Sequence, residues 1–220
     1  EKAPEGEPGG AVLAAGIRDI RGAIVVTGGN LTLIVLPAEQ KHTLSDMNLE
    51  VRIQSLNEPI TLKAGLKVNG TGQVAAEGTA KLLENGAFDP QRLLADLKVE
   101  ITKLDLQPLG AIAAAVAGAP EMAGLLETRF TAKINGLGNV DVDGGLQLAG
   151  LALKGGPLGT DQPVWDSIAA EVKIRQDGER LVVEKFLFNS PFANLGADGA
   201  IEALSGAAPM GSVAVSGRVD

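Results

Sequence analysis

Few residues of this chain have the chemistry of a catalytic or metal-binding group. It has no cysteine and only one histidine, His42, among its 220 residues. Without cysteine there is no thiol nucleophile, disulfide scaffold or cysteine-based zinc site, and one histidine gives no imidazole cluster for a metal. Ser167, Ser190 and Ser205 have no second histidine to activate them, and no G-x-S-x-G turn occurs. We expect no catalytic residue, no metal site and no cofactor, and we interpret His42 as a loop or solvent-exposed residue.

Two short motifs have the spacing of ligand-binding loops but lack the context that such loops need. The segment Gly70–Ala75 (GTGQVA) matches a dinucleotide fingerprint, which requires a helix directly after the glycines. The residues that follow alternate like a strand and include Gly78. The segment Asp141–Gly144 (DVDG) matches part of a calcium loop, but Gly150 stands where the bidentate glutamate should be. We interpret the second segment as a β-turn and expect neither ligand.

The charge balance excludes another class of partner. The chain has 19 Lys and Arg residues against 27 Asp and Glu residues, a formal charge of −8. An acidic chain with no dense basic patch does not suit a nucleic-acid backbone, so we expect no nucleic acid. Most acidic residues alternate with Lys and Arg, which is typical of a wet sheet face. A pair of carboxylates in a cleft, as in a glycan-acting enzyme, stays open as an alternative.

Apolar residues alternate with polar or charged ones through most of the chain, which predicts β-strands with one apolar and one charged face. The clearest apolar positions are Leu49, Val51, Ile53, Leu97, Val99, Ile101, Phe130, Ile134, Val172 and Ile174. Further strands are predicted at Ile17–Thr27, Leu31–Leu36, Ile60–Val68, Gln73–Leu83, Val140–Leu153, Leu181–Phe188 and Ala193–Ala203. Turns rich in Gly, Asn and Asp are predicted between strands at Gly28–Asn30, Asn69–Gly70, Asn85–Gly86, Asp143–Gly145 and Asp177–Gly178.

Three strands share a finer spacing of apolar residues. Leu49–Leu56, Leu97–Leu104 and Phe130–Leu137 all place them at i, i+2, i+4 and i+7. The last step moves the apolar side by one residue, which a bulge or a strand end would produce. We therefore expect such an irregularity at Gln54–Ser55, Thr102–Lys103 and Asn135–Gly136.

Two short helices are predicted between strands. Asp89 and Pro90 form an N-cap and first-turn pair, followed by Leu93 and Leu94. The second helix is predicted at Pro108–Ala117. It lies within an uncharged stretch that is too short to span a bilayer, so we expect a buried or interfacial element. Trp165 is expected to anchor the start of a strand.

Short turns between consecutive strands indicate a mainly β fold. We predict a long antiparallel meander, bent into a groove or closed into a sandwich, with two short helices. Residues Glu1–Gly10 are charged and rich in Pro and Gly, which predicts a flexible linker, and residues 11–220 are expected to form one elongated domain. The first methionine is Met47, and strand-like alternation persists at Val213 and Val215. We expect the chain to be part of a longer protein.

Three segments resemble the AsmA-like family of Gram-negative envelope proteins, which includes TamB. One is a strand–turn–strand, LKVNGTGQVAAEGTAKL (Leu66–Leu82), and another is a strand running into a leucine-rich turn and short helix (Leu93–Gly118). The third, Val164–Glu202, has the pattern D-G-x-x-L-x-V-x-x-F followed by a glycine-punctuated strand. Together they cover more than half of the chain.

The resemblance implies a long β-meander bent like a taco, with apolar side chains inside. It implies a periplasmic protein anchored in the inner membrane through a segment before Glu1. It also implies a role in moving phospholipids between membranes or in outer-membrane assembly, with envelope proteins as partners. The apolar strand positions named above would then contact acyl chains.

A second hypothesis remains from the residues alone. A sheet with one apolar face must cover it, and a second sheet would do so as well as a lipid. A closed β-sandwich that serves as a structural or interaction module of an envelope protein is therefore the alternative.

Overall fold

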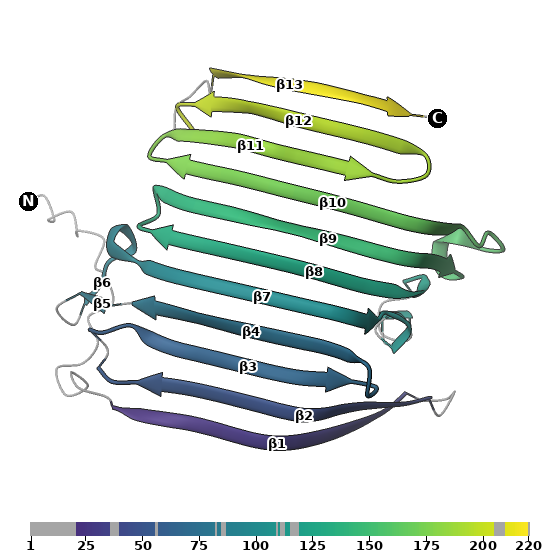
Figure 1. Ribbon diagram of the computed structural model, residues 1–220, viewed down its shortest axis with the longest axis horizontal. Helices are drawn as coiled ribbons and strands as arrows, with labels where there is room; N and C mark the ends of the chain where they lie inside the picture. Colours follow the sequence, from purple (N-terminus) through teal and green to yellow (C-terminus); the bar gives the residue numbers. More distant parts are fainter. Residues whose placement is uncertain are drawn as a thin grey trace, which may run out of the picture.

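The computed structural model describes residues 21–35, 40–55, 57–81, 83–84, 87–108, 110, 113–114, 119–204 and 210–219. They form a single layer, an 11-stranded sheet in the order β1-β2-β3-β4-β7-β8-β9-β10-β11-β12-β13 (Figure 1). The segment predicted as a linker, Glu1–Gly10, lies outside the described residues.

The sheet begins with β1 (Gly22–Val35), β2 (Gln40–Ile53), β3 (Ile60–Val68), β4 (Gly72–Lys81) and β7 (Leu94–Asp105). It continues with β8 (Glu121–Asn135), β9 (Asn139–Lys154), β10 (Val164–Asp177), β11 (Arg180–Asn189), β12 (Ala193–Glu202) and β13 (Met210–Val219). A separate two-stranded ribbon pairs β5 (Leu83–Glu84) with β6 (Ala87–Phe88).

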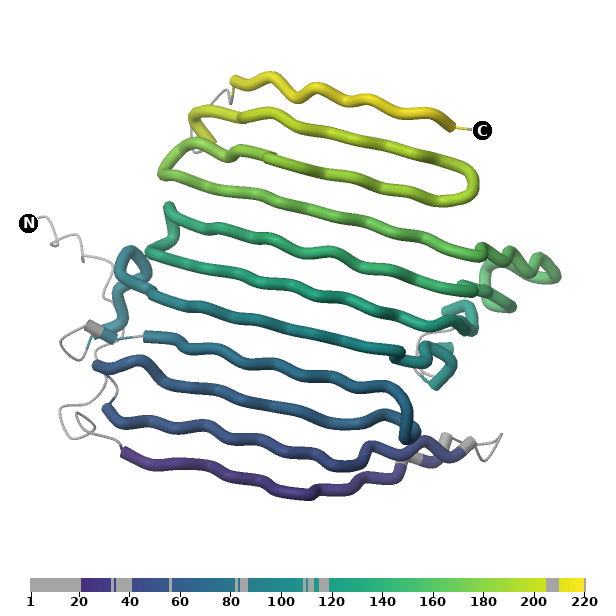
Figure 2. Tube along the Cα trace, in the orientation of Figure 1, coloured from purple at the N-terminus to yellow at the C-terminus, as the bar shows by residue number. Residues whose placement is uncertain are grey.

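Each strand of the large sheet pairs antiparallel with the next one along the chain, so the path is a simple meander (Figure 2). The predicted mainly β meander is confirmed. The sheet is open, because β1 and β13 are its two edges, and no second sheet covers it within the described residues. An open sheet is consistent with the groove rather than with the sandwich.

The predicted irregularities in the apolar spacing are confirmed. The register between β7 and β8 shifts between Ile101 and Leu104, and Lys103 has a positive φ of 50°. This bulge returns Leu104 to the side of the sheet that Ile101 occupies. The other two copies of the spacing end with their strands, at Ile53 in β2 and at Asn135 in β8.

Two of the predicted turns lie inside strands instead. Gly28–Asn30 belongs to β1, where the register with β2 shifts on both sides of Gly29, so this segment is a bulge. Asp143–Gly145 lies in the middle of β9. The turn prediction at Asp143–Gly145 was wrong because Gly144 is needed for packing between strands. Gly144 is paired with Phe130, whose ring fills the space that a Cβ would need.

The predicted turns at Asn69–Gly70 and Asp177–Gly178 do connect strands, and Asn69, Gly70 and Gly178 have positive φ angles. The predicted turn at Asn85–Gly86 lies outside the described residues.

The first predicted helix is only a single 3-10 turn, Pro90–Arg92, although its cap is as predicted. The Asp89 side chain accepts a hydrogen bond from the Gln91 amide at 3.0 Å. The turn ends because Leu94 already begins β7. Most of the second predicted helix, Pro108–Ala117, lies outside the described residues. A 3-10 turn that was not predicted, Gly156–Leu158, connects β9 and β10.

The core of this layer is thin. The buried apolar residues among those described are Val68, Leu83, Leu104, Leu106 and Ala193, and no large side chain is less than 2% exposed. The accessible surface is 14417 Å², whereas a compact monomer of this mass exposes roughly 9,500 Å². A single sheet leaves both of its faces accessible, which contributes to this excess.

His42 and Trp165 lie in strands. The interpretation of His42 as an exposed or loop residue was wrong: it lies in β2, is 9% exposed, and its Nε2 atom has no hydrogen-bond partner. Trp165 is the second residue of β10, at the start of a strand as predicted. Its ring lies 6.3 Å from that of Phe192, which lies 6.4 Å from that of Phe188. No helix within the described residues is long and apolar enough to cross a bilayer.

Candidate apolar binding face

The strand registers bring the apolar positions together on one side of the sheet, here called the apolar face. One row of successive partners crosses the sheet from β2 to β13. It consists of Val51, Leu62, Gly78, Leu97, Ala132, Val142, Ile174, Val183, Gly199 and Val213. A second row lies beside it and consists of Leu49, Ala64, Ala76, Val99, Phe130, Gly144, Val172, Phe186, Ala197 and Val215. Neighbouring strands lie about 4.8 Å apart, so each row spans roughly 43 Å.

All ten sequence-predicted site residues lie on this face. Leu49 and Val51 of β2, Leu97 and Val99 of β7, Phe130 of β8, and Val172 and Ile174 of β10 belong to the two rows above. Strict alternation within the same strands also places Ile53, Ile101 and Ile134 on the apolar face.

The structure adds residues that were not named as site candidates, from β3, β4, β9, β11, β12 and β13. Alternation already placed strands in most of these segments. Their share of the face depends on the small residues Ala64, Ala76, Gly78, Gly144 and Gly199, and small residues give weak periodic signals. Only the register shows that these residues continue the apolar rows.

The apolar face carries no charged side chain along the registers from β3 to β12. Its polar members are Thr128 and Gln176, which are paired with Ile101 and Leu181. The Thr128 hydroxyl donates a hydrogen bond to the Gly145 carbonyl at 2.7 Å. That donor is therefore satisfied by the sheet itself. The face offers dispersion contacts and few directional hydrogen bonds.

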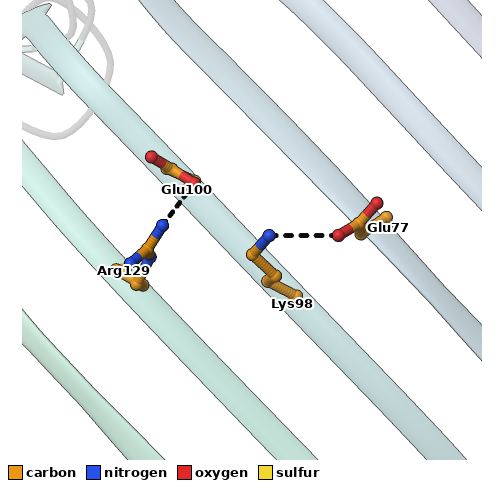
Figure 3. A network of polar contacts seen from close by, with 4 residues as sticks. All are labelled: Glu77, Lys98, Glu100 and Arg129. Atoms are coloured by element: carbon orange, nitrogen blue, oxygen red, sulfur yellow. Dashed lines mark hydrogen bonds and ion pairs between the residues drawn. The ribbon is translucent and has the colours of Figure 1, made fainter.

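The opposite side is the charged face, where ionic side chains pair across strands. Glu50, Lys63, Glu77 and Lys98 follow one another in register across β2, β3, β4 and β7. Lys98 Nζ lies 3.1 Å from Glu77 Oε1, and Arg129 Nη2 lies 3.3 Å from Glu100 Oε2 (Figure 3). Alternating signs stabilise neighbouring positions of an antiparallel sheet and keep this face in water.

The densest ionic group on the charged face lies where β9, β10 and β11 meet. Lys173 Nζ lies 2.6 Å from Glu184 Oε2, and Arg175 bridges Asp141 and Glu184 at 2.8 and 3.4 Å. The hydrogen bond from Lys173 lowers the pKa of Glu184 and raises the pKa of Lys173. The hydrogen bond to Asp141 raises the pKa of Arg175. On β2 and β3, the hydrogen bond to Asp46 raises the pKa of Lys67. These groups are held in their charged forms.

We expect reversal of one charge in this ladder to destabilise the sheet modestly. Glu77→Lys would place three lysines side by side, because Glu77 is paired with both Lys63 and Lys98. Both partners of the present pair are solvent-exposed, so the loss should be on the order of 1 kcal/mol in the free energy of unfolding. Urea unfolding in low salt measures it.

The double variant Glu77→Lys/Lys98→Glu is the control, because it restores an opposite-charge pair at the same two positions. It should recover part of the loss, and 1 M salt should shrink the difference between the variants. Equal stability of the single variant and the unmodified protein in low salt would contradict the expectation.

A shallow hollow of about 770 Å³ lies on the charged face, above β7, β8, β9 and β10. Its rim includes Glu100, Arg129, Asp143 and Glu171, and its floor includes Gly145. The small floor residue leaves a depression among long ionic side chains. Within the described residues, no group of three or more His, Asp or Glu side chains is arranged to hold a metal ion.

The comparisons with known proteins add no relative: no family model, no curated protein and no solved structure matches this chain.

Proposed function

We propose that the apolar face binds the acyl chains of phospholipids, and that the chain is an AsmA-like periplasmic segment that supports lipid transport or outer-membrane assembly. The single observation that carries this proposal is the uncovered apolar face. Large apolar side chains are exposed to water across the sheet, including Leu97 at 36%, Phe186 at 37% and Val213 at 45%. An exposed apolar surface of this kind is typical of a binding site.

The shape of the face supports a chain-like ligand. The two apolar rows run perpendicular to the strands for roughly 43 Å, longer than the hydrocarbon thickness of a bilayer, about 30 Å. The two rows consist of Leu, Val, Ile, Phe, Ala and Gly and contain no charge that a sliding acyl chain would have to desolvate. An extended hydrocarbon therefore meets the same kind of surface at each strand.

The energetics favour a ligand of many methylene groups. A fully buried methylene gains about 0.8 kcal/mol, and a chain lying on an open face is covered on one side, so roughly half of that is available. One short apolar molecule would bind weakly. A phospholipid with two long chains would gain enough to offset the cost of ordering them.

The resemblance to the AsmA-like family supplies the cellular setting of the proposal. The resembling segments, Leu66–Leu82, Leu93–Gly118 and Val164–Glu202, contribute to β3, β4, β7, β10, β11 and β12, which all belong to the open sheet. The partners are then phospholipid, an inner-membrane anchor in the parent protein and other envelope proteins. The position of the apolar side chains on one side of an open layer supports the proposal, because it leaves them accessible to an acyl chain.

Native mass spectrometry of the purified protein, followed by titration with a pyrene-labelled phosphatidylcholine, tests the proposal. We expect co-purified phospholipid and saturable binding of the probe. The head-group-matched short-chain phosphatidylcholine with two-carbon chains is the control, and it should not compete. Absence of bound lipid together with no saturable probe binding would overturn the proposal.

A further inference from the structure

Three aromatic side chains meet at one end of the sheet. Trp165 is the second residue of β10, Phe188 lies near the end of β11, and Phe192 lies in the turn before β12. Figure 1 shows that the start of β10 and the turn between β11 and β12 lie at the same end of the sheet. The ring of Phe192 lies 6.3 Å from that of Trp165 and 6.4 Å from that of Phe188. These three residues are here called the aromatic cluster.

The aromatic cluster gathers a scarce residue type in an exposed place. The chain has only five phenylalanines, one tryptophan and no tyrosine. The cluster is continuous with the apolar face, because Phe188 follows Phe186 of the second row by two residues, with no register shift against β12. Phe192 is 41% exposed, Val164 beside Trp165 is 64% exposed, and the other two rings are only half-buried. Aromatic surface therefore stays in contact with water at this end of the sheet.

The turn that carries Phe192 is held together without its side chain. The Ser190 amide donates a hydrogen bond to the Ala193 carbonyl at 2.8 Å, and the Ala193 amide donates one to the Ser190 hydroxyl oxygen at 3.0 Å. The segment Asn189–Asn194 contains no charged residue. An exposed phenylalanine on an uncharged turn that does not need its ring points to a contact outside the fold.

Polar groups of both signs lie beside the aromatic cluster. A hollow of about 260 Å³ lies between the starts of β8 and β10 and the end of β9, directly next to the tryptophan. Its lining includes Gln107, Glu121, Lys154, Gln162 and Val164. Lys154 Nζ lies 3.8 Å from Glu121 Oε2, and both side chains are exposed. Because the two charges balance and the two amides both donate and accept hydrogen bonds, this border suits surroundings that carry both charges.

Aromatic rings beside balanced polar groups match the interface of a bilayer, where amphipathic rings lie at the level of the head groups. The formal charge of −8 disfavours an anionic surface. We propose that the aromatic cluster inserts into the head-group region of a zwitterionic phospholipid bilayer. An apolar contact of this size gives reversible attachment. The contact stands by itself, whereas its use as the place where acyl chains reach the apolar face rests on the proposed function.

Trp165 reports on this contact directly, because it is the only tryptophan in the chain. Phosphatidylcholine vesicles should shift its emission to shorter wavelength, and vesicles of brominated phosphatidylcholine should quench it. Phe192→Asp should weaken co-sedimentation with the vesicles at least tenfold, since a charge replaces the exposed ring. Leu137→Asp is the matched control: Leu137 is 53% exposed in the turn between β8 and β9, at the opposite end of the strands, and its replacement should leave sedimentation within twofold.

Two further measurements separate the aromatic cluster from the apolar face. Val99→Glu changes the second apolar row and leaves the cluster intact, so this variant should sediment with vesicles as the unmodified protein does. Phe192→Asp should bind the monomeric pyrene-labelled probe within about twofold of the unmodified protein. Vesicle binding by a protein that binds no probe would support this inference and contradict the proposed function.

Three results would refute the contact. The first is that the unmodified protein neither sediments with phosphatidylcholine vesicles nor shows quenching of Trp165. The second is equal sedimentation of Phe192→Asp and Leu137→Asp. The third is loss of sedimentation in Val99→Glu, because the vesicle would then be held by the apolar face and not by the aromatic cluster.

Discussion

Val99→Glu is expected to abolish binding of an acyl-chain probe while the sheet remains folded. Val99 lies in the second apolar row, between Ala76 of β4 and Phe130 of β8. A bound acyl chain would cover the new carboxylate and remove it from water. The effective penalty for burying an unpaired charge is several kcal/mol, and each 1.4 kcal/mol weakens binding tenfold. We expect at least a hundredfold loss of affinity in titrations with pyrene-labelled phosphatidylcholine.

Thr61→Glu is the matched control, because it adds the same group to the charged face. Thr61 is paired with Arg52 of β2, so the new carboxylate gains an opposite charge as neighbour. We expect probe binding within about twofold of the unmodified protein. Circular dichroism should show the same strand content in both variants. Unchanged binding by a folded Val99→Glu protein would mean that the apolar face does not bind the probe.

Gly144→Ala is expected to destabilise the sheet, because the added methyl group has no room on the apolar face. A Cβ at Gly144 would lie 2.6 Å from Phe130 Cδ2 and 2.9 Å from the Arg129 carbonyl oxygen. Phe130 and the backbone of β8 would have to move, and overpacking of this kind costs about 1–3 kcal/mol. For a chain of this size that corresponds to a Tm lower by roughly 2–12 °C. Thermal unfolding followed by circular dichroism measures it.

Gly65→Ala controls for the loss of glycine from a central strand. A Cβ there meets only the Val74 carbonyl oxygen, at 3.8 Å, which is ordinary contact. Replacing glycine in a strand at a site with room should be neutral or stabilising by about 0.5–1 kcal/mol. Equal thermal stability of the two variants would show that the contact with Phe130 does not constrain position 144.

The strands and the composition of their two faces could be predicted from alternation alone. Leu97, Val99 and Ile101 share one side of β7 because successive strand residues point to opposite faces. The bulge after Ile101 was also predictable, because Leu104 is apolar three residues later. Positions such as Gly29 and Gly144 were misassigned to turns, since the same residue type serves both positive φ angles and close packing between strands.

The length of the first predicted helix was overestimated for a related reason. Asp89 and Pro90 give the local start of a helix, and the structure keeps that start. The turn ends at Arg92 because Leu94 and the residues after it pair with both β4 and β8. Ladder hydrogen bonds on two sides outweigh a local propensity of a few tenths of a kcal/mol per residue.

The sequence by itself determined that this chain forms strands with one aliphatic and one ionic face, connected in order. That follows from the period of two, which is a local property of the backbone. Only the tertiary structure decided that the strands stay in one open layer and that their apolar rows align across it. Closure and register depend on contacts between residues far apart in the chain, such as Gly144 with Phe130 and Val172, and no local pattern specifies them.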